Sequence, residues 1–324
     1  MQLPLLKCHG SDNDFIIIDE LFEDITLTEA QRVEIAVQLS DRKRIVGSDG
    51  ILFVQKSEHA DAKMRMLNSD GSEAEMCGNG LRCVARYVIE RLDSKELVIE
   101  TMKADLPVAQ VDNLFDDVET FEVAIEPVSL TPSTLPLLVE KNTVVEEVLS
   151  ELDESLTFTA LSVPNPHLVT VVPEVRDDVA KQIGEKANEL KTLLPNGTNV
   201  SFMKQVADQM VYVRTFERGV GLTNACGTAM SASSLVACLL EMVSFDKPIT
   251  VLNPGGMVQT LVTQDSHGQY FIKLRGNATY EFAAVVDIDF DDKEQTVLLE
   301  QDVFEEEALK YEGLRQAAKE LAVG

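Results

Sequence analysis

The sequence contains no tryptophan, and aromatic residues make up only 6% of its 324 positions. Carbohydrate and single-stranded nucleic acid are usually stacked on aromatic side chains, so this scarcity disfavours both ligands. Positive charge is also scarce, because 28 Lys and Arg stand against 55 Asp and Glu, giving a net charge of −27. A nucleic-acid binder has to neutralise phosphates, and an anionic membrane repels an acidic surface. We therefore expect neither nucleic acid nor membrane as a partner.

Long apolar runs are missing as well. No segment approaches the ~18 consecutive apolar residues of a transmembrane helix, and the first residues lack the apolar stretch of a secretory signal. The five cysteines are an odd number, which is typical of reduced thiols rather than of a disulfide framework. These features predict a cytoplasmic protein.

Cofactor motifs are not found either. Cysteine and histidine do not occur at the spacings of metal ligands, and no glycine-rich phosphate or dinucleotide loop is present. The sequence thus predicts no metal site and no nucleotide-binding loop of these two kinds.

What the sequence does contain is an apolar fraction of 45%, sufficient for a core, over a length that suits two domains. Short apolar runs such as Phe15–Ile18 predict many strands. Helical spacing predicts helices over 28–39, 81–92, 180–194, 229–240 and 304–321, with a short acidic helix over 144–152. Three prolines between 127 and 136 predict a linker.

The two halves of the chain repeat one pattern. A turn-rich segment, a Cys-Gly pair and a helix of small and apolar residues occur at Cys77 and again at Cys226. Asn13 precedes the first cysteine by 64 residues, and Asn165 precedes the second by 61. Similar spacing predicts two copies of one unit. Two such lobes would place their cysteines facing each other across a cleft.

Cys77 and Cys226 stand at predicted helix starts, where free N–H groups and the helix dipole lower a thiol pKa and hold a carboxylate. Inverting a stereocentre without a cofactor needs a base on one face and an acid on the other, and a thiolate and a thiol fill these roles. The other three cysteines, Cys8, Cys83 and Cys238, are expected to be small buried hydrophobes.

Several segments together resemble the diaminopimelate epimerase family over residues 3 to about 283. They are Lys7–Phe15, Asn68–Gly80 with Arg82 and Cys83, Asn165–His167, Gly197–Val200, Glu217–Gly221, Ala225–Thr228 and Asn253–Gly256. The resemblance implies an α+β fold of two pseudosymmetric lobes, each a mostly antiparallel barrel-like sheet around a central helix. We place the lobes at 1–128 and 129–285, followed by an acidic extension at 286–324.

The resemblance further implies a cofactor-independent epimerisation of LL- to meso-diaminopimelate, in lysine and peptidoglycan precursor biosynthesis, with Cys77 and Cys226 as the bases. His167 would support them and, with Glu217, set their protonation. The residues expected to contact the substrate are Asn13, Asn68, Gly78, Asn79, Asn165, Asn199, Glu217, Arg218, Gly227 and Thr228. Arg218 suits a distal carboxylate because its planar fork matches one bidentately. Diaminopimelate is the expected partner. A homodimer is possible, and the sequence does not decide the oligomeric state.

Four residues depart from the family pattern. Asp12 stands where Gly is usual, Leu222 where many members have Glu, Ala229 where Gly is common and Gly50 where some have Gln. Three alternatives remain: a proline-type racemase, which also uses two cysteines, a thiol redox protein, and a binding protein that has lost catalysis. The first lacks a purpose for the polar set around Arg218, and the intact cysteines argue against the last.

Overall fold

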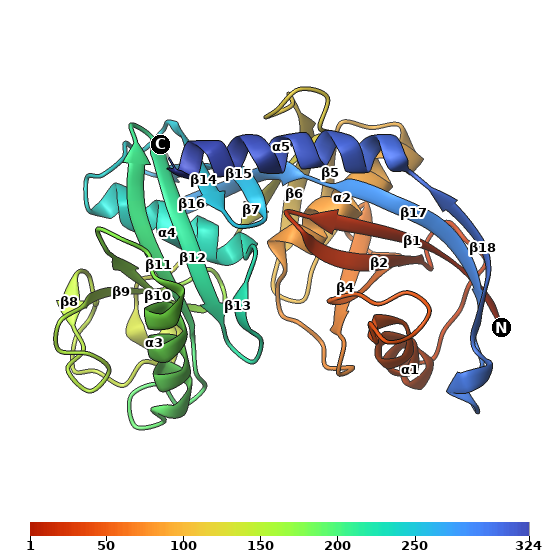
Figure 1. The fold of residues 1–324 in the computed structure, drawn as a ribbon, viewed down its shortest axis with the longest axis horizontal. Helices are drawn as coiled ribbons and strands as arrows, with labels where there is room; N and C mark the ends of the chain where they lie inside the picture. Colours follow the sequence, from red (N-terminus) through yellow and green to blue (C-terminus); the bar gives the residue numbers. More distant parts are fainter. Residues whose placement is uncertain (324) are drawn as a thin grey trace. The chain divides into compact units, whose positions relative to one another are not determined.

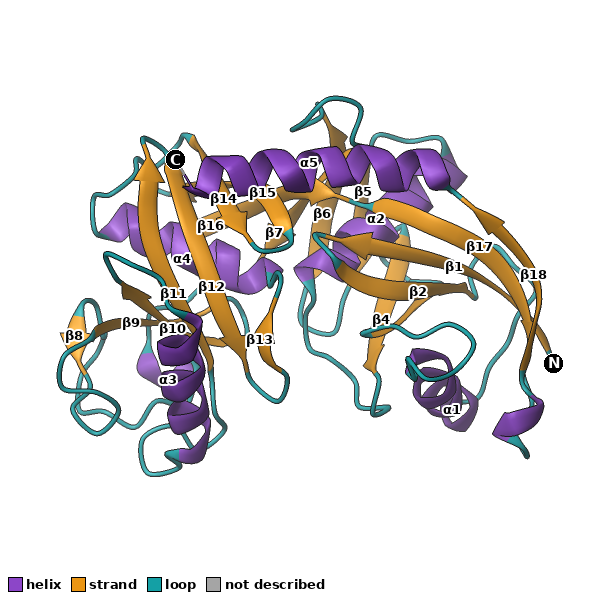
Figure 2. Cartoon of the chain, in the orientation of Figure 1, coloured by secondary structure: helices purple, strands orange, loops and turns teal. Residues whose placement is uncertain are grey.

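The computed structural model describes residues 1–323 and has an α+β fold in which strands predominate (Figures 1 and 2). The chain divides into two compact units. The first consists of Met1–Val123 and Gly276–Leu314, and the second of Ala124–Arg275 together with the residues from Arg315. The lobe boundaries proposed from the sequence differ from this division, because the chain returns to the first unit after Arg275.

The first unit is built on a mostly antiparallel sheet. Its strands follow the order β1 (Gln2–Gly10), β2 (Asn13–Asp19), β3 (Gly50–Gln55), β4 (Ala62–Asn68), β5 (Glu96–Glu100), β6 (Asp105–Val111) and β7 (Thr120–Ile125). On the other side of β1 lie β17 (Thr279–Asp287) and β18 (Val297–Val303). The pairs β2–β3 and β4–β5 are parallel, because α1 (Glu29–Ser40) and α2 (Gly78–Leu92) supply the crossovers.

The second unit has a sheet of the same kind. It contains β8 (Glu147–Val148), β9 (Thr157–Ser162), β10 (Pro166–Val171), β11 (Asn199–Ala207), β12 (Met210–Glu217), β14 (Pro248–Asn253), β15 (Gly256–Gln264) and β16 (Tyr270–Asn277). The short β13 (Gly221–Thr223) pairs with the end of β12. The parallel pairs are β10–β11 and β12–β14, with α3 (Asp177–Glu189) and α4 (Gly227–Leu239) as crossovers.

The order of elements is the same in both units. It runs β1-β2-α1-β3-β4-α2-β5-β6-β7 in the first and β9-β10-α3-β11-β12-α4-β14-β15-β16 in the second, with parallel pairs at the same two places. The predicted internal repeat is therefore confirmed. In each copy the cysteine directly precedes the second helix, which begins at the following glycine, so the repeat sets both cysteines at the same point of the topology.

The second helix of each copy is surrounded by the strands of its own unit. Helix α2 packs against β1 to β6, and α4 packs against β9 to β12, β14 and β15. Helix α4 has no charged side chain, and all its residues from Gly227 to Cys238 are buried. Such a helix is stable only when apolar neighbours enclose it. Two of its serines satisfy their hydroxyls within the helix, as Ser231 and Ser234 donate to carbonyls one turn back at 2.9 Å.

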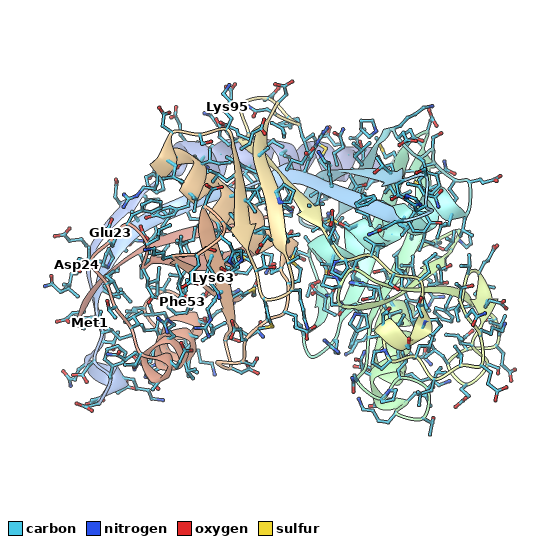
Figure 3. The ribbon with its side chains drawn as sticks, turned by 180° about the vertical axis from the view of Figure 1, so that it is seen from behind. Met1, Glu23, Asp24, Phe53, Lys63 and Lys95 are labelled. Carbon is cyan, nitrogen blue, oxygen red and sulfur yellow. The ribbon has the colours of Figure 1, made fainter. Side chains whose placement is uncertain are left out.

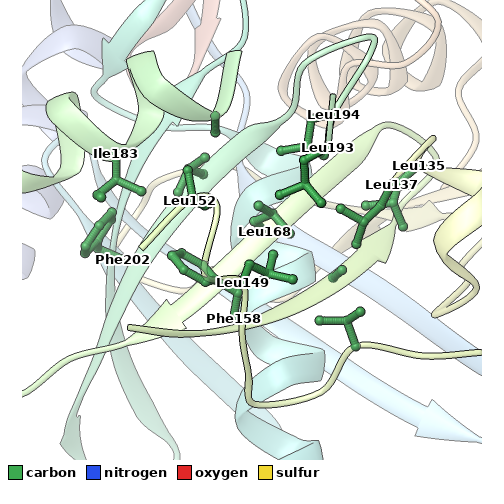
Figure 4. Close-up of a cluster of buried hydrophobic side chains, with 14 of the residues drawn as sticks. Leu135, Leu137, Leu149, Leu152, Phe158, Leu168, Ile183, Leu193, Leu194 and Phe202 are labelled. Carbon is green, nitrogen blue, oxygen red and sulfur yellow. The ribbon is translucent and has the colours of Figure 1, made fainter. Parts of the chain in front are cut away.

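Each unit has its own hydrophobic core. In the first, Phe53 of β3, labelled in Figure 3, is fully buried among side chains of β1, β2 and α1 such as Leu3, Ile16 and Ile35. In the second, Phe158 and Phe202 lie among leucines of the strands and of the loops before α4 (Figure 4). Each fully buried large apolar side chain stabilises the fold by about 1.5–3 kcal/mol.

The expected helices form, with shifted ends. Thr28 caps α1 through a capping box with Gln31. Helix α3 begins earlier than predicted, with Asp177 and Asp178 in its first turn, and ends at Glu189. The predicted C-terminal helix is α5 (Glu305–Val323). Within residues 1–323, no helix is long and apolar enough to cross a membrane.

Two local predictions are wrong. Residues 144–152 form no helix, because Glu147 and Val148 pair with β9 as strand β8 and Glu146 adopts a left-handed φ of 53°. The segment 127–136 is more than a linker. It contains the short η1 (Pro132–Thr134), and Leu135 is fully buried in the second core. A second such turn, η2 (Lys293–Gln295), precedes β18.

Candidate active site

Cys77 is the N-cap residue of α2 in the first unit. Its backbone is extended, and its Sγ accepts a hydrogen bond from the N–H of Gly80 at 3.3 Å. Its carbonyl oxygen accepts the first helical bond, from Leu81 at 2.8 Å. The thiol therefore stands at the positive end of the helix dipole, where a thiolate is stabilised. Gly78 and Asn79 follow as the first two helical residues, whose N–H groups have no acceptor within a helix.

Asn13 belongs to the same cluster. Its Oδ1 accepts a hydrogen bond from Asn79 Nδ2 at 3.1 Å and lies 4.0 Å from Cys77 Sγ. Its Nδ2 donates to Asp49 Oδ2 at 2.6 Å, which fixes the orientation of the amide. The structure thus brings Asn13, Cys77 and Asn79 together, as the sequence predicted. The sequence analysis did not predict Asp49 as a member of this cluster, although Asp49 directly precedes β3, the strand that pairs with β2.

Cys226 is the N-cap residue of α4 in the second unit. Its backbone is extended like that of Cys77, and its carbonyl accepts a hydrogen bond from Met230 at 3.0 Å. Its Sγ lies 3.5 Å from Thr228 Oγ1. The residue is only 7% exposed. Both cysteines thus occupy the helix starts that the sequence predicted.

The surroundings of Cys226 raise its pKa well above the ordinary thiol value. Burial is the largest cause, and the negative charge of Glu217 is the next, while the hydrogen bond with Thr228 opposes both. The expectation that the helix start lowers the pKa of both thiols is therefore wrong for Cys226. Desolvation and a nearby carboxylate outweigh the dipole, so at neutral pH this cysteine is a thiol.

His167 holds the polar cluster of the second unit together. Its Nε2 lies 3.0 Å from Asn165 Oδ1 and 3.1 Å from Thr228 Oγ1, and the amide of Asn165 donates to the same hydroxyl at 3.1 Å. The side chain is fully buried, and burial, helped by the charge of Arg218, lowers its pKa to about 3. The imidazole is therefore neutral at pH 7, and its contacts in this cluster are hydrogen bonds and not ion pairs.

Asn199 joins this cluster to the loop that carries Arg218. Its Oδ1 accepts a hydrogen bond from the backbone N–H of Arg218 at 2.9 Å, and its Nδ2 lies 3.4 Å from His167 Nε2. The guanidinium of Arg218 donates to the carbonyl of Asn196 at 3.1 Å. Glu217 accepts a hydrogen bond from Thr223 Oγ1 at 2.5 Å. Thr223 was missed because nothing in its local sequence distinguishes it from a turn residue.

Among residues 1–323, the hydrogen bonds of the Asn68 side chain lie within its own turn and not in the cluster around Cys77. Asn68 ends β4, and its Nδ2 donates to Ser72 Oγ at 3.0 Å within the turn. Its position is that of Glu217 in the second copy, since both stand nine residues before a cysteine. The turn role that its sequence suggested is therefore present in the structure.

The departures from the family pattern have local explanations. Asp12 has φ 67° in the two-residue turn between β1 and β2, a conformation in which glycine is usual and aspartate is tolerated. Leu222 packs against the second core instead of presenting a charge. A Cβ at Gly50 would lie 2.7 Å from the carbonyl oxygen of Leu67, so a larger residue there needs a shift of β4. Ala229 is fully buried in α4.

The arrangement offers thiols, amides and helix N–H groups. Among residues 1–323, no group of three or more His, Cys, Asp and Glu side chains could hold a metal ion. All five cysteines are present as thiols. Each copy provides one thiol next to free helix N–H groups, which suits proton transfer at a carbon beside a carboxylate.

The sequence of this chain is similar to that of known enzymes. The model of the diaminopimelate epimerase family matches residues 5–120 and 159–280. A diaminopimelate epimerase from Clostridium acetobutylicum is 46% identical over 311 residues, which cover 96% of this chain and 93% of the relative. One from Enterococcus faecalis is 44% identical over 285 residues, covering 86% and 87%.

Solved structures share the fold at low identity. A phenazine biosynthesis protein of the PhzF family from Bacillus anthracis has a TM-score of 0.67 and 19% identity, covering 89% of this chain and 100% of that one. A hydroxyproline epimerase from Agrobacterium vitis has a TM-score of 0.63 and 13% identity, covering 90% and 92%. Both support the α+β assignment and nothing finer.

Proposed function

Because this chain belongs to the diaminopimelate epimerase family, we propose that it converts LL- to meso-diaminopimelate by moving one α-proton between Cys77 and Cys226. The reaction would serve lysine and peptidoglycan precursor biosynthesis. The observation that carries the proposal is that both cysteines are N-cap residues of enclosed helices at the same point of a repeated topology.

The proposed reaction has two steps. The thiolate of one cysteine removes the α-proton, and the thiol of the other donates its proton to the opposite face of the carbanion, so the stereocentre inverts and the two roles exchange. Atoms and charge balance without a cofactor. The raised pKa of Cys226 makes it the proton donor in the resting enzyme, which leaves Cys77 as the base for the first turnover.

Substrate contacts are proposed for the polar groups around each thiol. The N–H groups of Gly78 and Asn79, and of Gly227 and Thr228, are directed to a carboxylate at a helix start, where they also stabilise the charge that develops as the C–H bond breaks. Amide and charged side chains complete the set for the second amino-acid end: Asn13, Asn68, Asn165, Asn199, Glu217 and Arg218.

His167 is proposed to position Thr228 and Asn165. Its neutral ring lies within 3.1 Å of polar atoms of both, and Thr228 in turn is close to Cys226. A neutral imidazole cannot lower the thiol pKa by its charge, so we assign the electrostatic control of Cys226 to Glu217 instead.

Proton NMR in deuterated water tests the function. LL-diaminopimelate incubated with the reduced protein should lose its α-proton signal while the meso isomer appears. Dialysis against chelator should leave the rate unchanged. No exchange by folded, reduced protein would contradict the assignment, and exchange of the α-proton of proline instead would identify a proline-type racemase.

Location and assembly complete the proposal. A cytoplasmic enzyme fits the five thiols and the biosynthetic family. A homodimer stays a prediction, to be tested by light scattering of the purified protein.

A further inference from the structure

Arg82 is a buried cation without an ordinary counter-charge. It lies on α2, and its side chain is 0% exposed. Its Nε donates to the carbonyl of Asn277 at 3.0 Å, and its Nη2 donates to Ser11 Oγ at 3.0 Å. Both partners are neutral, and Nη1 is buried with no hydrogen bond to any residue that the structure describes. Burial lowers the pKa of Arg82 to about 10, so the group is still charged at pH 7.

Arg86, one helical turn later, shows the contrast. It is 6% exposed, and its two terminal nitrogens bond both oxygens of Glu307 at 2.6 and 2.7 Å, while Nε bonds Glu90 at 2.8 Å. A buried cation is unfavourable unless an anion compensates it. Arg86 meets this need with two carboxylates, whereas the hydrogen-bond partners of Arg82 within residues 1–323 include none.

The guanidinium of Arg82 lies under the first turn of α2. A Cβ at Gly10 would be 2.9 Å from Arg82 Nη2 and 3.0 Å from the carbonyl oxygen of Asn79, so both groups meet at this one point. Cys77 caps the same turn, two residues before Asn79. Arg82 thus carries its charge beneath the turn that Cys77 caps, and its interaction with an anion at Cys77 is favourable.

The titratable groups that act on Arg82 are thiols, an imidazole and a phenol. The facing groups are Cys77 and Cys83 from α2, His9 from β1 and Tyr311 from α5. His9 is neutral, since burial lowers its pKa to about 4, and its ring packs edge-on against Tyr311 at 4.3 Å. Cys83 is fully buried, whereas Cys77 is partly exposed at the helix start, where a proton can enter and leave.

The second copy lacks this charge. Arg82 stands five residues after Cys77, and the residue five positions after Cys226 is Ser231, whose hydroxyl donates to the carbonyl of Gly227 at 2.9 Å. A positive charge five residues after the cysteine is thus present in the first copy, and a hydroxyl takes its place in the second. The two helix starts are thus alike in backbone and differ at this position of the helix.

We propose that Arg82 is a positioning residue that stabilises the thiolate of Cys77 from the interior of the first unit and so makes Cys77 the resting base. This rests on the proposed function in taking Cys77 as one of the two bases. Its test measures the reactivity of the thiol itself. The test can therefore fail while epimerisation is established, and it can succeed even if the protein does not epimerise diaminopimelate.

The experiment is the pH dependence of iodoacetamide alkylation at each cysteine, followed by peptide mass spectrometry. Arg82→Met should raise the apparent pKa of Cys77 by about one unit or more, as expected for loss of an adjacent opposite charge, and leave Cys226 unchanged. Arg82→Lys should restore most of the shift, because it keeps the charge. Arg86→Met is the matched control, which should lower the melting temperature without moving the profile of Cys77.

An unchanged Cys77 profile in folded Arg82→Met would overturn the proposal, as would a shift found at Cys83 instead. If that variant does not fold, the wild type and Cys77→Ala are compared by urea unfolding between pH 6 and 9. If the fold stabilises the thiolate, Cys77 loses its proton at a lower pH in the folded protein than in the unfolded chain, where the thiol pKa is ~8.5. The free energy of unfolding of the wild type should therefore rise relative to that of Cys77→Ala as pH increases. A pH-independent difference would overturn the proposal.

Discussion

The carboxylate of Glu217 raises the pKa of the Cys226 thiol, and only burial raises it more. Glu217 is held by the hydroxyl of Thr223, so its charge has a fixed place at the end of β12. The corresponding residue before Cys77 is Asn68, which carries no charge. The repeat therefore carries a carboxylate nine residues before one cysteine and an uncharged amide nine residues before the other.

Replacing Glu217 by Gln should lower the pKa of Cys226, because the neighbouring negative charge is removed while the shape is kept. Alkylation of Cys226 between pH 7 and 8 should then be faster than in the wild type. Glu174→Gln, at an exposed position, serves as the control and should leave the rate unchanged. Equal alkylation rates in Glu217→Gln and wild type would contradict the electrostatic role of Glu217.

Cys77→Ala and Cys226→Ala should each reduce epimerisation by on the order of a thousand-fold, since a positioned acid or base contributes about 10²–10⁴. The NMR assay with LL-diaminopimelate measures the loss. Cys83→Ala in α2 and Cys238→Ala in α4 are matched controls, because both side chains are buried within the same helices. They should cost about 1 kcal/mol of stability and keep most of the turnover. Near-normal turnover in either of the first two variants would refute the two-base assignment.

Acid should destabilise the protein through His167. Burial lowers its pKa to about 3, whereas the unfolded chain binds the proton near ~6.5, so stability falls as pH falls from about 6.5 towards 3. At pH 5 this single group accounts for about 2 kcal/mol. Urea unfolding of His167→Gln should therefore show a shallower loss between pH 7 and pH 5 than the wild type. The exposed His267→Gln is the control, and parallel curves for wild type and His167→Gln would exclude this contribution.

Two helical glycines should respond to alanine in opposite directions. A Cβ at Gly184 in α3 would lie 2.2 Å from the ring of Phe216, so overpacking should outweigh the better helix propensity and cost about 1–3 kcal/mol net. At Gly313 in α5 the nearest atom, on Phe115, is 3.4 Å away, so alanine should stabilise by about 0.5–1 kcal/mol. Urea unfolding of both variants measures the signs, and a stabilised Gly184→Ala would show that Phe216 can move aside.

The features that the sequence predicts correctly are set by local chemistry. Cys77 and Cys226 are followed by glycine and by small residues, and both helices begin at the expected position. The repeat follows from spacing alone, and it fixes the strand order. The core of the second unit is harder to predict from the sequence, because Leu135 is buried although it lies in a proline-rich segment.

The features that the sequence does not reveal depend on distant neighbours. Helix propensity at Val144–Leu152 is overridden by pairing with β9. The pKa of Cys226 depends on burial, which no local pattern gives. Arg82 is desolvated partly by Asn277, 195 residues away. Its one sequence signal is the four-residue spacing from Arg86, which places two cations on one stripe of a helix that is otherwise enclosed.

Strand β1 pairs with β17 along residues 2–9 and with β2 only along residues 6–10, so its first residues depend on residues 279–287 for their strand pairing. On the ribosome these first residues emerge long before that partner strand exists. The stretch from Ala124 to Arg275, by contrast, contains the whole second copy in one continuous segment. During synthesis the first unit therefore begins to emerge before the second unit but can be completed only after it. Until β17 is made, one edge of β1 is exposed to nascent-chain chaperones.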